Sequence, residues 1–200
     1  MGPQLPGNRT AQFLGTRIHI MGNTCAGKST LAERLASRWK LPPIDLDALN
    51  WLPKWVGLTQ TDPNEFERRL RSATAGDDWV VAGSYSEFCQ RVFSPRLQTV
   101  IWLDMPLARI VARVLTRAWR RQRSGELLWG TNTERMWPHL KVWHEDSLVR
   151  WAVTQHRRKQ RWMLAQIFDP MWAHIRFIRL RSPAEVDALV AGAAPNSRAP

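Results

Sequence analysis

The chain has 200 residues, of which 44% are hydrophobic, and this length allows one compact domain but not two comfortable ones. No apolar run approaches the roughly 20 residues of a membrane helix, and residues 1–17 lack the apolar stretch of a secretory signal. We therefore expect a cytoplasmic protein without a membrane partner. Its two cysteines provide neither a disulfide framework nor a paired zinc spacing.

Most of the net charge lies in one third of the chain. The 29 Lys and Arg outnumber the 17 Asp and Glu and give a net charge of +12. Between Met105 and Ala165, 13 basic and four acidic residues leave a surplus of +9. A basic surplus this local indicates an anionic partner, either the phosphates of a small ligand or a nucleic-acid backbone.

Strand-like and helix-like segments alternate between an expected flexible leader at residues 1–16 and an expected disordered tail at 193–200. The expected strands are 17–22, a short strand that runs into a polar turn within 42–51, and 79–86, 99–106 and 174–180. The expected helices are 28–39, 61–74, 106–121, one that carries residues 150–161, and 182–192. This alternation predicts a single α/β domain at 17–192, with three α/β/α layers around a five-stranded parallel sheet.

One motif carries specific chemistry. Residues 22–29 satisfy G-x-x-x-x-G-K-[ST] in full, directly between a strand and a helix. Glycines let backbone N–H groups curl around phosphate oxygens, Lys28 would reach the β- and γ-phosphates, and the Ser29 hydroxyl would ligate Mg²⁺. The predicted nucleotide-binding residues of this P-loop are Gly22, Asn23, Thr24, Cys25, Ala26, Gly27, Lys28, Ser29 and Thr30.

Two carboxylates, Asp45 and Asp47, end the second expected strand. In a parallel sheet whose first strand feeds the P-loop, that strand end faces the same crevice. Side chains two apart on an extended segment point the same way, so we expect Asp45 near the metal and Asp47 near an acceptor. A turn in which both aspartates cap local N–H groups is the alternative.

From these motifs onward the chain resembles the small nucleoside-monophosphate-kinase-like family, in particular the adenylate-kinase-related bacterial branch labelled topology modulation protein. The residues that carry the resemblance are the P-loop, 46–51 with Trp55, 79–86, 100–106 with the Arg-rich helix after it, and 178–186. The resemblance implies a P-loop NTPase of the nucleotide-kinase type. It also implies ATP and Mg²⁺ as cofactors and transfer of the ATP γ-phosphate to a small acceptor.

The helix at 106–121 combines an apolar stripe with a ridge of Arg109, Arg113 and Arg117, spaced by four. In adenylate-kinase-like enzymes the matching helix carries two arginines, one on the nucleotide base and one on the transferring phosphates. The resemblance implies these roles for Arg113 and Arg117 respectively. A solvated basic surface is the alternative for any single arginine.

Residues 122–144 would form a short Arg-rich helical lid. On the helix after it, Arg157 and Arg161 are assigned to neutralising the transferring phosphates, although which of Arg157, Arg158 and Arg161 points inward stays open. Trp51 and Trp55 are expected to stack on the acceptor, with core packing as the alternative. By their place in the matching motifs, we also assign Gly83 and Tyr85 to the acceptor site, and Ser182 and Pro183 to the nucleotide site.

One position departs from the family pattern. Ala82 stands where related kinases commonly have an acidic residue that acts on Mg²⁺. Asp45 or Asp47 would then have to supply that carboxylate, or turnover would be weak. Asp104 is expected to lie too far across the sheet to replace it.

Two classes of function follow. The first is a phosphotransferase whose acceptor is a nucleotide or nucleoside, slightly favoured over a small alcohol, with Asp47 orienting a hydroxyl. The second is a nucleotide-regulated protein that binds DNA and modulates its topology with little or no turnover. The net charge supports it, but no recognition motif is present and the basic residues fall where a lid needs them. A nucleotide-binding protein that has lost turnover is a third possibility.

Overall fold

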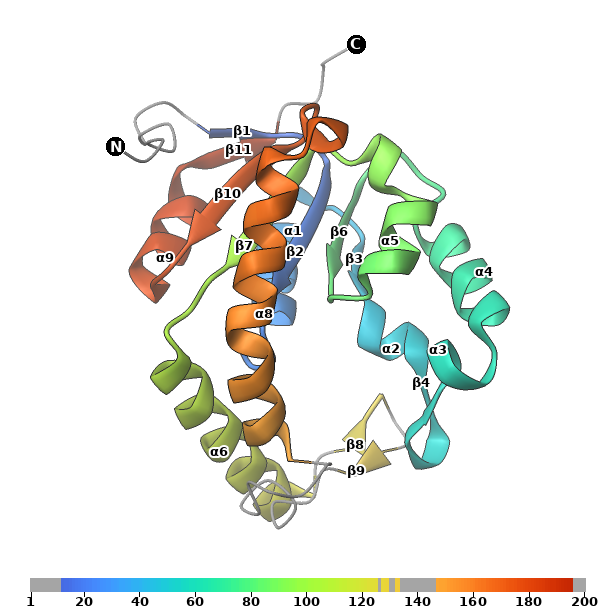
Figure 1. Cartoon of the computed structure of the whole chain (residues 1–200), viewed down its shortest axis with the longest axis vertical. Coiled ribbons are helices and arrows are strands. Elements are labelled where there is room, and N and C mark those ends of the chain that lie inside the picture. Colours follow the sequence, from blue (N-terminus) through green and yellow to red (C-terminus); the bar gives the residue numbers. More distant parts are fainter. Residues whose placement is uncertain (1–11, 126, 130–131, 134–146, 196–200) are drawn as a thin grey trace.

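The computed structural model describes residues 12–125, 127–129, 132–133 and 147–195, and Figure 1 shows how their elements are arranged. Five parallel strands form the central sheet in the order β10-β7-β2-β6-β3. Their bounds are β2 Arg17–Gly22, β3 Pro43–Asp45, β6 Trp79–Ala82, β7 Thr99–Leu103 and β10 Arg176–Leu180. The prediction of a five-stranded parallel sheet is confirmed.

Helices cover both faces of this sheet. The longer helices are α1 Lys28–Trp39, α4 Pro63–Ala73, α5 Ser86–Val92, α6 Leu107–Ser124, α8 Leu148–Phe168 and α9 Pro183–Gly192. One hydrophobic cluster joins the sheet to α1 and α9, and a second joins it to α4, α5 and α8. In Figure 1, α8 crosses in front of β2 and α1 lies behind it, which confirms the three-layer architecture.

The side chains of β2 alternate between the two clusters. Ile18 and Ile20 belong to the cluster with α1, whereas Met21 belongs to the other. The strands β6 and β7 are buried along their whole length. Successive side chains of a strand point to opposite faces, so a strand covered on both faces must be apolar throughout.

The segment after β3 is helical, and the prediction of extended chain there is wrong. The helix α2 Leu46–Asn50 begins directly after Asp45, whose Oδ1 accepts a hydrogen bond from the Asp47 N–H at 2.9 Å. A carboxylate at this position satisfies an N–H that has no partner inside the helix. Four short elements follow, β4 Trp51–Leu52, η1 Pro53–Trp55, β5 Val56–Gly57 and α3 Leu58–Thr61.

Residues 12–16 of the expected leader and 193–195 of the expected tail are described, and the rest of both segments lies outside the described residues. The strand β1 Gln12–Leu14 pairs in parallel with β11 Ala193–Pro195, so regular structure extends into both segments. After α6, the strands β8 Leu127–Leu128 and β9 Asn132–Thr133 form a hairpin within the region expected to be a helical lid. Residues 134–146, which include much of that lid, lie outside the described residues. Among the described residues, no helix is long and apolar enough to cross a membrane.

Candidate active site

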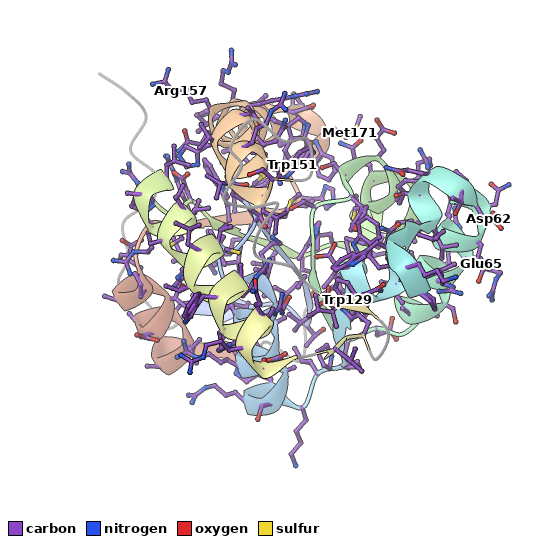
Figure 2. The ribbon with its side chains drawn as sticks, turned by 90° about the horizontal axis from the view of Figure 1, so that it is seen from below. Asp62, Glu65, Trp129, Trp151, Arg157 and Met171 are labelled. Atoms are coloured by element: carbon purple, nitrogen blue, oxygen red, sulfur yellow. The ribbon has the colours of Figure 1, made fainter. Side chains whose placement is uncertain are left out.

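A cleft of about 1160 Å³ opens at the carboxyl ends of the sheet strands. Figure 2 views the molecule from the side on which α6 and the β8–β9 hairpin lie. The P-loop, β3 with α2, the turn after β6, and the helices α6 and α8 all contribute side chains to its walls. Strand ends of parallel sheets are where ligands bind in such folds, because the flanking loops diverge there. This cleft is the candidate site.

The P-loop has the backbone conformation that its glycines predict. Gly22 has φ of 154°, and a Cβ on it would lie 2.8 Å from the Leu103 carbonyl oxygen. Gly27 has φ of 101° and immediately precedes α1. Cys25 also adopts a positive φ, 52°, which is rare for a residue with a side chain. The loop therefore has a strained turn that presents the start of a helix to the cleft.

Lys28 lies at the centre of the site. Its Nζ donates a hydrogen bond to the Asn23 carbonyl oxygen at 3.0 Å. Burial lowers the pKa of Lys28 below its ordinary value, and the charge of Asp47 acts in the opposite direction. A buried cation that has one neutral partner is suited to an anionic ligand, which would satisfy it more fully.

Ser29 and Asp45 form a pair of oxygen ligands beside Lys28. The Ser29 Oγ donates to Asp45 Oδ2 at 3.3 Å, and burial followed by the charge of Asp47 raises the pKa of Asp45. The described residues contain no group of three or more His, Cys, Asp or Glu that could cage a metal. Mg²⁺ commonly takes one or two protein oxygens and completes its shell with phosphates and water. The donor set fits Mg²⁺ that arrives with a nucleotide.

Asp45 also stands next to the position that departs from the family pattern. In the register of β3 and β6, Asp45 pairs with Ala82, which is 2% exposed. The other candidate, Asp104, is held by Arg179, whose Nε donates to its Oδ2 at 2.9 Å, and by Gln160, whose Nε2 donates to its Oδ1 at 2.7 Å. Asp45 therefore provides the carboxylate beside Ala82, and Asp104 is engaged elsewhere.

Asp47 is oriented by a neighbouring hydroxyl. The Tyr85 hydroxyl donates to Asp47 Oδ1 at 2.7 Å. Burial, followed by the charge of Asp47, raises the pKa of Tyr85, so this hydroxyl keeps its proton. Gly83, with φ of 151°, allows the turn to approach α2, because a Cβ there would lie 2.6 Å from the Leu46 Cβ. The sequence motif thus places Tyr85 on Asp47, and Gly83 makes this contact possible.

Three tryptophans line the cleft beyond Asp47. The ring centroids of Trp51 and Trp55 lie 5.6 Å apart, and those of Trp55 and Trp129 lie 5.8 Å apart, both edge to face. Asn132 of the β8–β9 hairpin holds this wall, since its Oδ1 accepts from the Trp55 N–H at 2.9 Å and its Nδ2 donates to the Leu52 carbonyl at 3.0 Å. Trp51 and Trp55 are therefore cleft residues rather than core residues.

The arginines of α6 that line the cleft differ from the set that the predicted ridge contains. Arg113 Nη1 donates to the Ala26 carbonyl oxygen at 3.0 Å and so supports the P-loop. Arg117, Arg120 and Arg121 also line the cleft, whereas Arg109 is exposed and is not among the described lining residues. The two assigned arginines, Arg113 and Arg117, are thus at the site.

The assignment on α8 needs correction. Arg157 and Arg161 are exposed and are not among the described residues that line the cleft, and Figure 2 shows Arg157 at the outer edge of the molecule. Lys159 lines the cleft instead. Lys159 lies seven residues after Ala152 and four before Met163, both of which are buried in the structure. These spacings place all three on one side of the helix.

The last of the matching motifs, at residues 178–186, contributes to the rim of the cleft. Pro183 lines the cleft together with Val186 and Asp187 of α9. Ser182 instead caps that helix, since its Oγ accepts a hydrogen bond from the Glu185 N–H at 3.2 Å. Ser182 is thus placed to position Pro183, and it is not among the described residues that line the cleft.

Several solved structures are similar to this one over most of their length. One is a gluconokinase from Sinorhizobium meliloti, with 17% identity, 90% of this chain and 93% of that chain covered, and a TM-score of 0.50. A second is a sugar kinase from Janibacter sp., with 16% identity, 90% and 99% covered, and a TM-score of 0.50. A third is a deoxyadenosine kinase from M. mycoides, with 13% identity, 87% and 94% covered, and a TM-score of 0.53.

At these identities the likeness shows a shared fold, that of P-loop kinases, and not a shared activity. No family model matches the chain, and no curated protein matches it. The resemblance to the topology modulation branch stays a prediction.

Proposed function

We propose that the protein is an ATP-dependent phosphotransferase that moves the γ-phosphoryl group of ATP to a hydroxyl of a small acceptor, of the nucleoside class or close to it. The observation that carries this proposal is the placement of Asp47. Its carboxylate lies close enough to Lys28 to act on the pKa of that residue, and the Tyr85 hydroxyl fixes its orientation. A kinase needs these two groups, one for the phosphates and one for the acceptor, in one cleft.

The nucleotide end of the cleft is the P-loop. Its N–H groups and the start of α1 would bind the phosphate oxygens of ATP, and Lys28 and Arg117 would offset their charge. Ser29 and Asp45 would hold Mg²⁺, which would neutralise charge on the β- and γ-phosphates. Pro183 would lie beside the nucleotide at the rim of the cleft.

The acceptor end favours a neutral hydroxyl compound with a flat ring. Among the described residues of α2, β4, η1 and α3 that line the cleft, none is cationic. Trp51 and Trp55 offer aromatic surfaces for a base or a sugar, and Asp47 accepts hydrogen bonds from hydroxyl groups. The similar structures are titled gluconokinase, sugar kinase and deoxyadenosine kinase, which supports an acceptor with hydroxyl groups.

In the proposed step the acceptor oxygen forms a bond to the γ-phosphorus while the bond from that phosphorus to the bridging oxygen of ADP breaks. The acceptor proton passes to Asp47, and ADP leaves. Asp47 therefore orients the hydroxyl and receives its proton. The β8–β9 hairpin and the tryptophan wall that it holds would keep water from the phosphoryl group.

The test is ATP consumption by the purified protein with Mg²⁺, screened against nucleosides, nucleoside monophosphates and small alcohols. We expect turnover with a nucleoside or a similar hydroxyl compound, and a loss of about 10³-fold in Lys28→Ala, because a single phosphate-stabilising group has about this weight. Asp47→Asn should lower kcat strongly with little change in ATP affinity. Asp78→Asn, at an exposed position far from the cleft, is the matched control.

Two results would contradict the proposal. If no acceptor supports turnover while ATP binds and Lys28→Ala abolishes that binding, the protein is a nucleotide-dependent binding protein. If monophosphates alone are accepted and Asp47→Asn turns over normally, phosphoryl transfer remains but the hydroxyl acceptor is wrong.

A further inference from the structure

Among the described residues of α8 that line the cleft, Lys159 is the cationic one. Its side chain is half-buried and lines the cleft. Within the described part of the chain, no hydrogen bond or ion pair is formed by its ammonium group. An ammonium group partly withdrawn from water without a hydrogen-bond or ion-pair partner is unfavourable, so a half-buried lysine that lines a cleft points to an anionic ligand.

The surroundings of Lys159 sharpen this point. Burial, followed by the charge of Lys28, lowers its pKa to about 8, and the charge of Asp47 acts in the opposite direction. Lys28 belongs to the P-loop and Lys159 to α8, so two cations from different walls meet across the same space. Like charges held together at a shared site are favourable only when an anion lies between them.

Other cationic residues on α8 do not compete for this position. Arg157, Arg158 and Arg161 are exposed, and they are not among the described residues that line the cleft. Ala152 and Met163, on the same side of the helix as Lys159, are buried and fix the rotation of α8. The helix therefore presents a lysine, and not an arginine, to the cleft.

We propose that Lys159 binds the terminal phosphoryl oxygens of ATP from the α8 side, opposite Lys28, so that the phosphates lie between two lysines. This proposal rests on the proposed function for the identity of the ligand. It assigns to α8 a contact that the arginines of that helix were expected to make.

A lysine in this role makes ATP binding depend on pH. The bound phosphates stabilise the ammonium form, so the protein takes up a proton on binding when the pH is near the pKa of free Lys159. Affinity should therefore fall as the pH rises through about 8. The other charged or titratable groups among the described residues that line the cleft are Cys25, Lys28, Glu33, Arg34, Asp45, Asp47, Tyr85, Arg113, Arg117, Arg120, Arg121 and Asp187.

The experiment is calorimetric titration of the full chain with a non-hydrolysable ATP analogue and with ADP, between pH 6.5 and 9.5. It compares the natural protein with Lys159→Arg, Lys159→Met and the control Arg157→Met. We expect Lys159→Met to weaken binding of the ATP analogue by roughly 10–100-fold at pH 7, and ADP less, because a hydrogen bond to a charged group is lost. Arg157→Met should change neither affinity.

The variant Lys159→Arg tests whether Lys159 is the group that takes up the proton on binding. Its affinity for the ATP analogue should stay level between pH 7.5 and 9.5, where that of the natural protein falls, and it should lose proton uptake measured in two buffers of different ionisation enthalpy. This comparison also serves if Lys159→Met folds poorly. Equal affinity in Lys159→Met and the natural protein, or the same pH profile in Lys159→Arg, would overturn the inference.

These readouts separate the inference from the proposed function. Weaker analogue binding in Lys159→Met supports the lysine contact even if no acceptor is ever phosphorylated. Turnover that depends on Lys28 and Asp47, with nucleotide binding unchanged in Lys159→Met, leaves the kinase in place and refutes the contact.

Discussion

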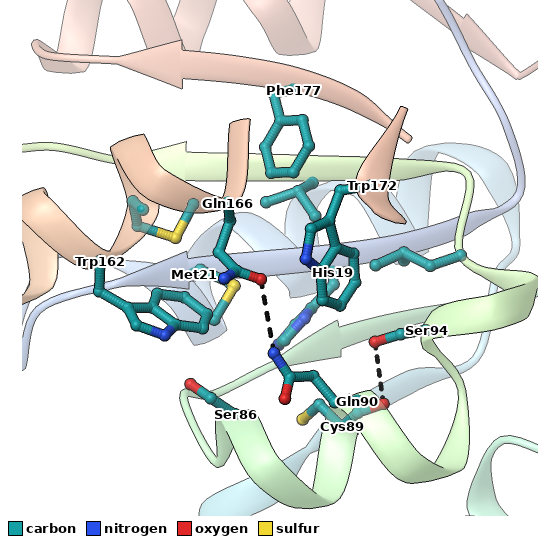
Figure 3. A pocket seen from close by; sticks show the side chains of 13 residues that line it. His19, Met21, Ser86, Cys89, Gln90, Ser94, Trp162, Gln166, Trp172 and Phe177 are labelled. Atoms are coloured by element: carbon teal, nitrogen blue, oxygen red, sulfur yellow. Dashed lines mark hydrogen bonds between the residues drawn. The ribbon is translucent and has the colours of Figure 1, made fainter. Parts of the chain in front are cut away.

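Two cavities in the described part of the molecule have opposite character. The cleft at the strand ends is large and open, whereas a small pocket of about 20 Å³ lies between the sheet, α5 and α8, with room for about one water molecule. We call this the α5–α8 pocket. Figure 3 shows it, lined mainly by His19, Met21, Cys89, Trp162, Trp172 and Phe177.

Polar groups in the α5–α8 pocket have partners within the protein. His19 Nε2 lies 3.2 Å from the Gly83 carbonyl oxygen, and the Ser94 hydroxyl donates to the Cys89 carbonyl oxygen at 3.0 Å. Gln90 Nε2 lies 3.4 Å from Gln166 Oε1, an interaction that links α5 to α8 (Figure 3). A buried polar group that is satisfied in this way stabilises the fold and leaves nothing for a ligand to bind.

In the cleft, by contrast, several groups are in states that are unfavourable for the protein alone. Lys28 and Lys159 meet across it with lowered pKa values, Asp45 has a raised pKa, and Cys25 adopts a strained backbone conformation. The shifted pKa values mark charges that are unfavourable for the protein alone, and a nucleotide with its metal would relieve them. The difference shows how to tell a site from a packing defect: by whether its charges are compensated from within, and not by its depth.

Among the changes that test this difference between the two cavities, we expect the largest effect from a substitution in the α5–α8 pocket. Trp172→Ala removes a large side chain that is 8% exposed and should lower the free energy of unfolding by about 3–5 kcal/mol. Denaturant unfolding measures the loss, and Trp172→Phe should retain much of the stability. ATP affinity of the folded fraction should not change. A marked loss of ATP affinity at full stability would mean that the pocket belongs to the functional site.

The sequence predicted the parts of the site that depend on local chemistry. The P-loop is a contiguous motif, and Asp45 ends a short strand with Asp47 two residues later, so both reach the cleft although Asp47 lies in a helix. The helix was missed because its start depends on one side-chain contact, from Asp45 to the Asp47 N–H, which apolar spacing does not reveal.

The sequence was less informative about which side of a helix faces the cleft. A strict spacing of four on α6 advances by about 40° per step, since the helix has 3.6 residues per turn. The predicted ridge therefore turns away at Arg109, and Arg120 and Arg121 complete the lining. On α8, apolar residues occur all around the helix, so the buried side was recognisable only once Ala152 and Met163 were placed by the fold.

The next largest effect is a dependence of the stability on pH that arises from His19 in the α5–α8 pocket. Burial, reinforced by the charge of Lys28, lowers the pKa of His19 to about 4, against a hydrogen bond to the Gly83 carbonyl oxygen that raises it. The unfolded chain takes up a proton below about pH 6.5, while the folded chain does so only near pH 4. Stability should therefore fall by about 3 kcal/mol as the pH drops through this window.

His19→Gln provides the comparison, because it keeps a donor for the Gly83 carbonyl and has no proton to gain. Unfolding by denaturant at several pH values between 4 and 7 should give a shallower slope for this variant than for the natural protein. Parallel slopes would show that His19 is protonated in the folded state.

The smallest effect lies in the cleft, at the contact between Tyr85 and Asp47. Tyr85→Phe removes the hydroxyl that orients the carboxylate and should lower kcat/KM for the acceptor by roughly tenfold, the weight of one hydrogen bond to a charged group. Because Tyr85 acts through Asp47, the loss should be much smaller in an Asp47→Asn background.

Tyr85 is the single tyrosine of the chain, so its ultraviolet titration reports this contact directly. Burial, the largest cause of the raised pKa of Tyr85, stays in Asp47→Asn, and the pKa should fall by the part that the charge and hydrogen bond of Asp47 contribute. Additive losses in the double variant, with the tyrosine titration unmoved, would mean that the two groups act independently and that the cleft orients its acceptor by other means.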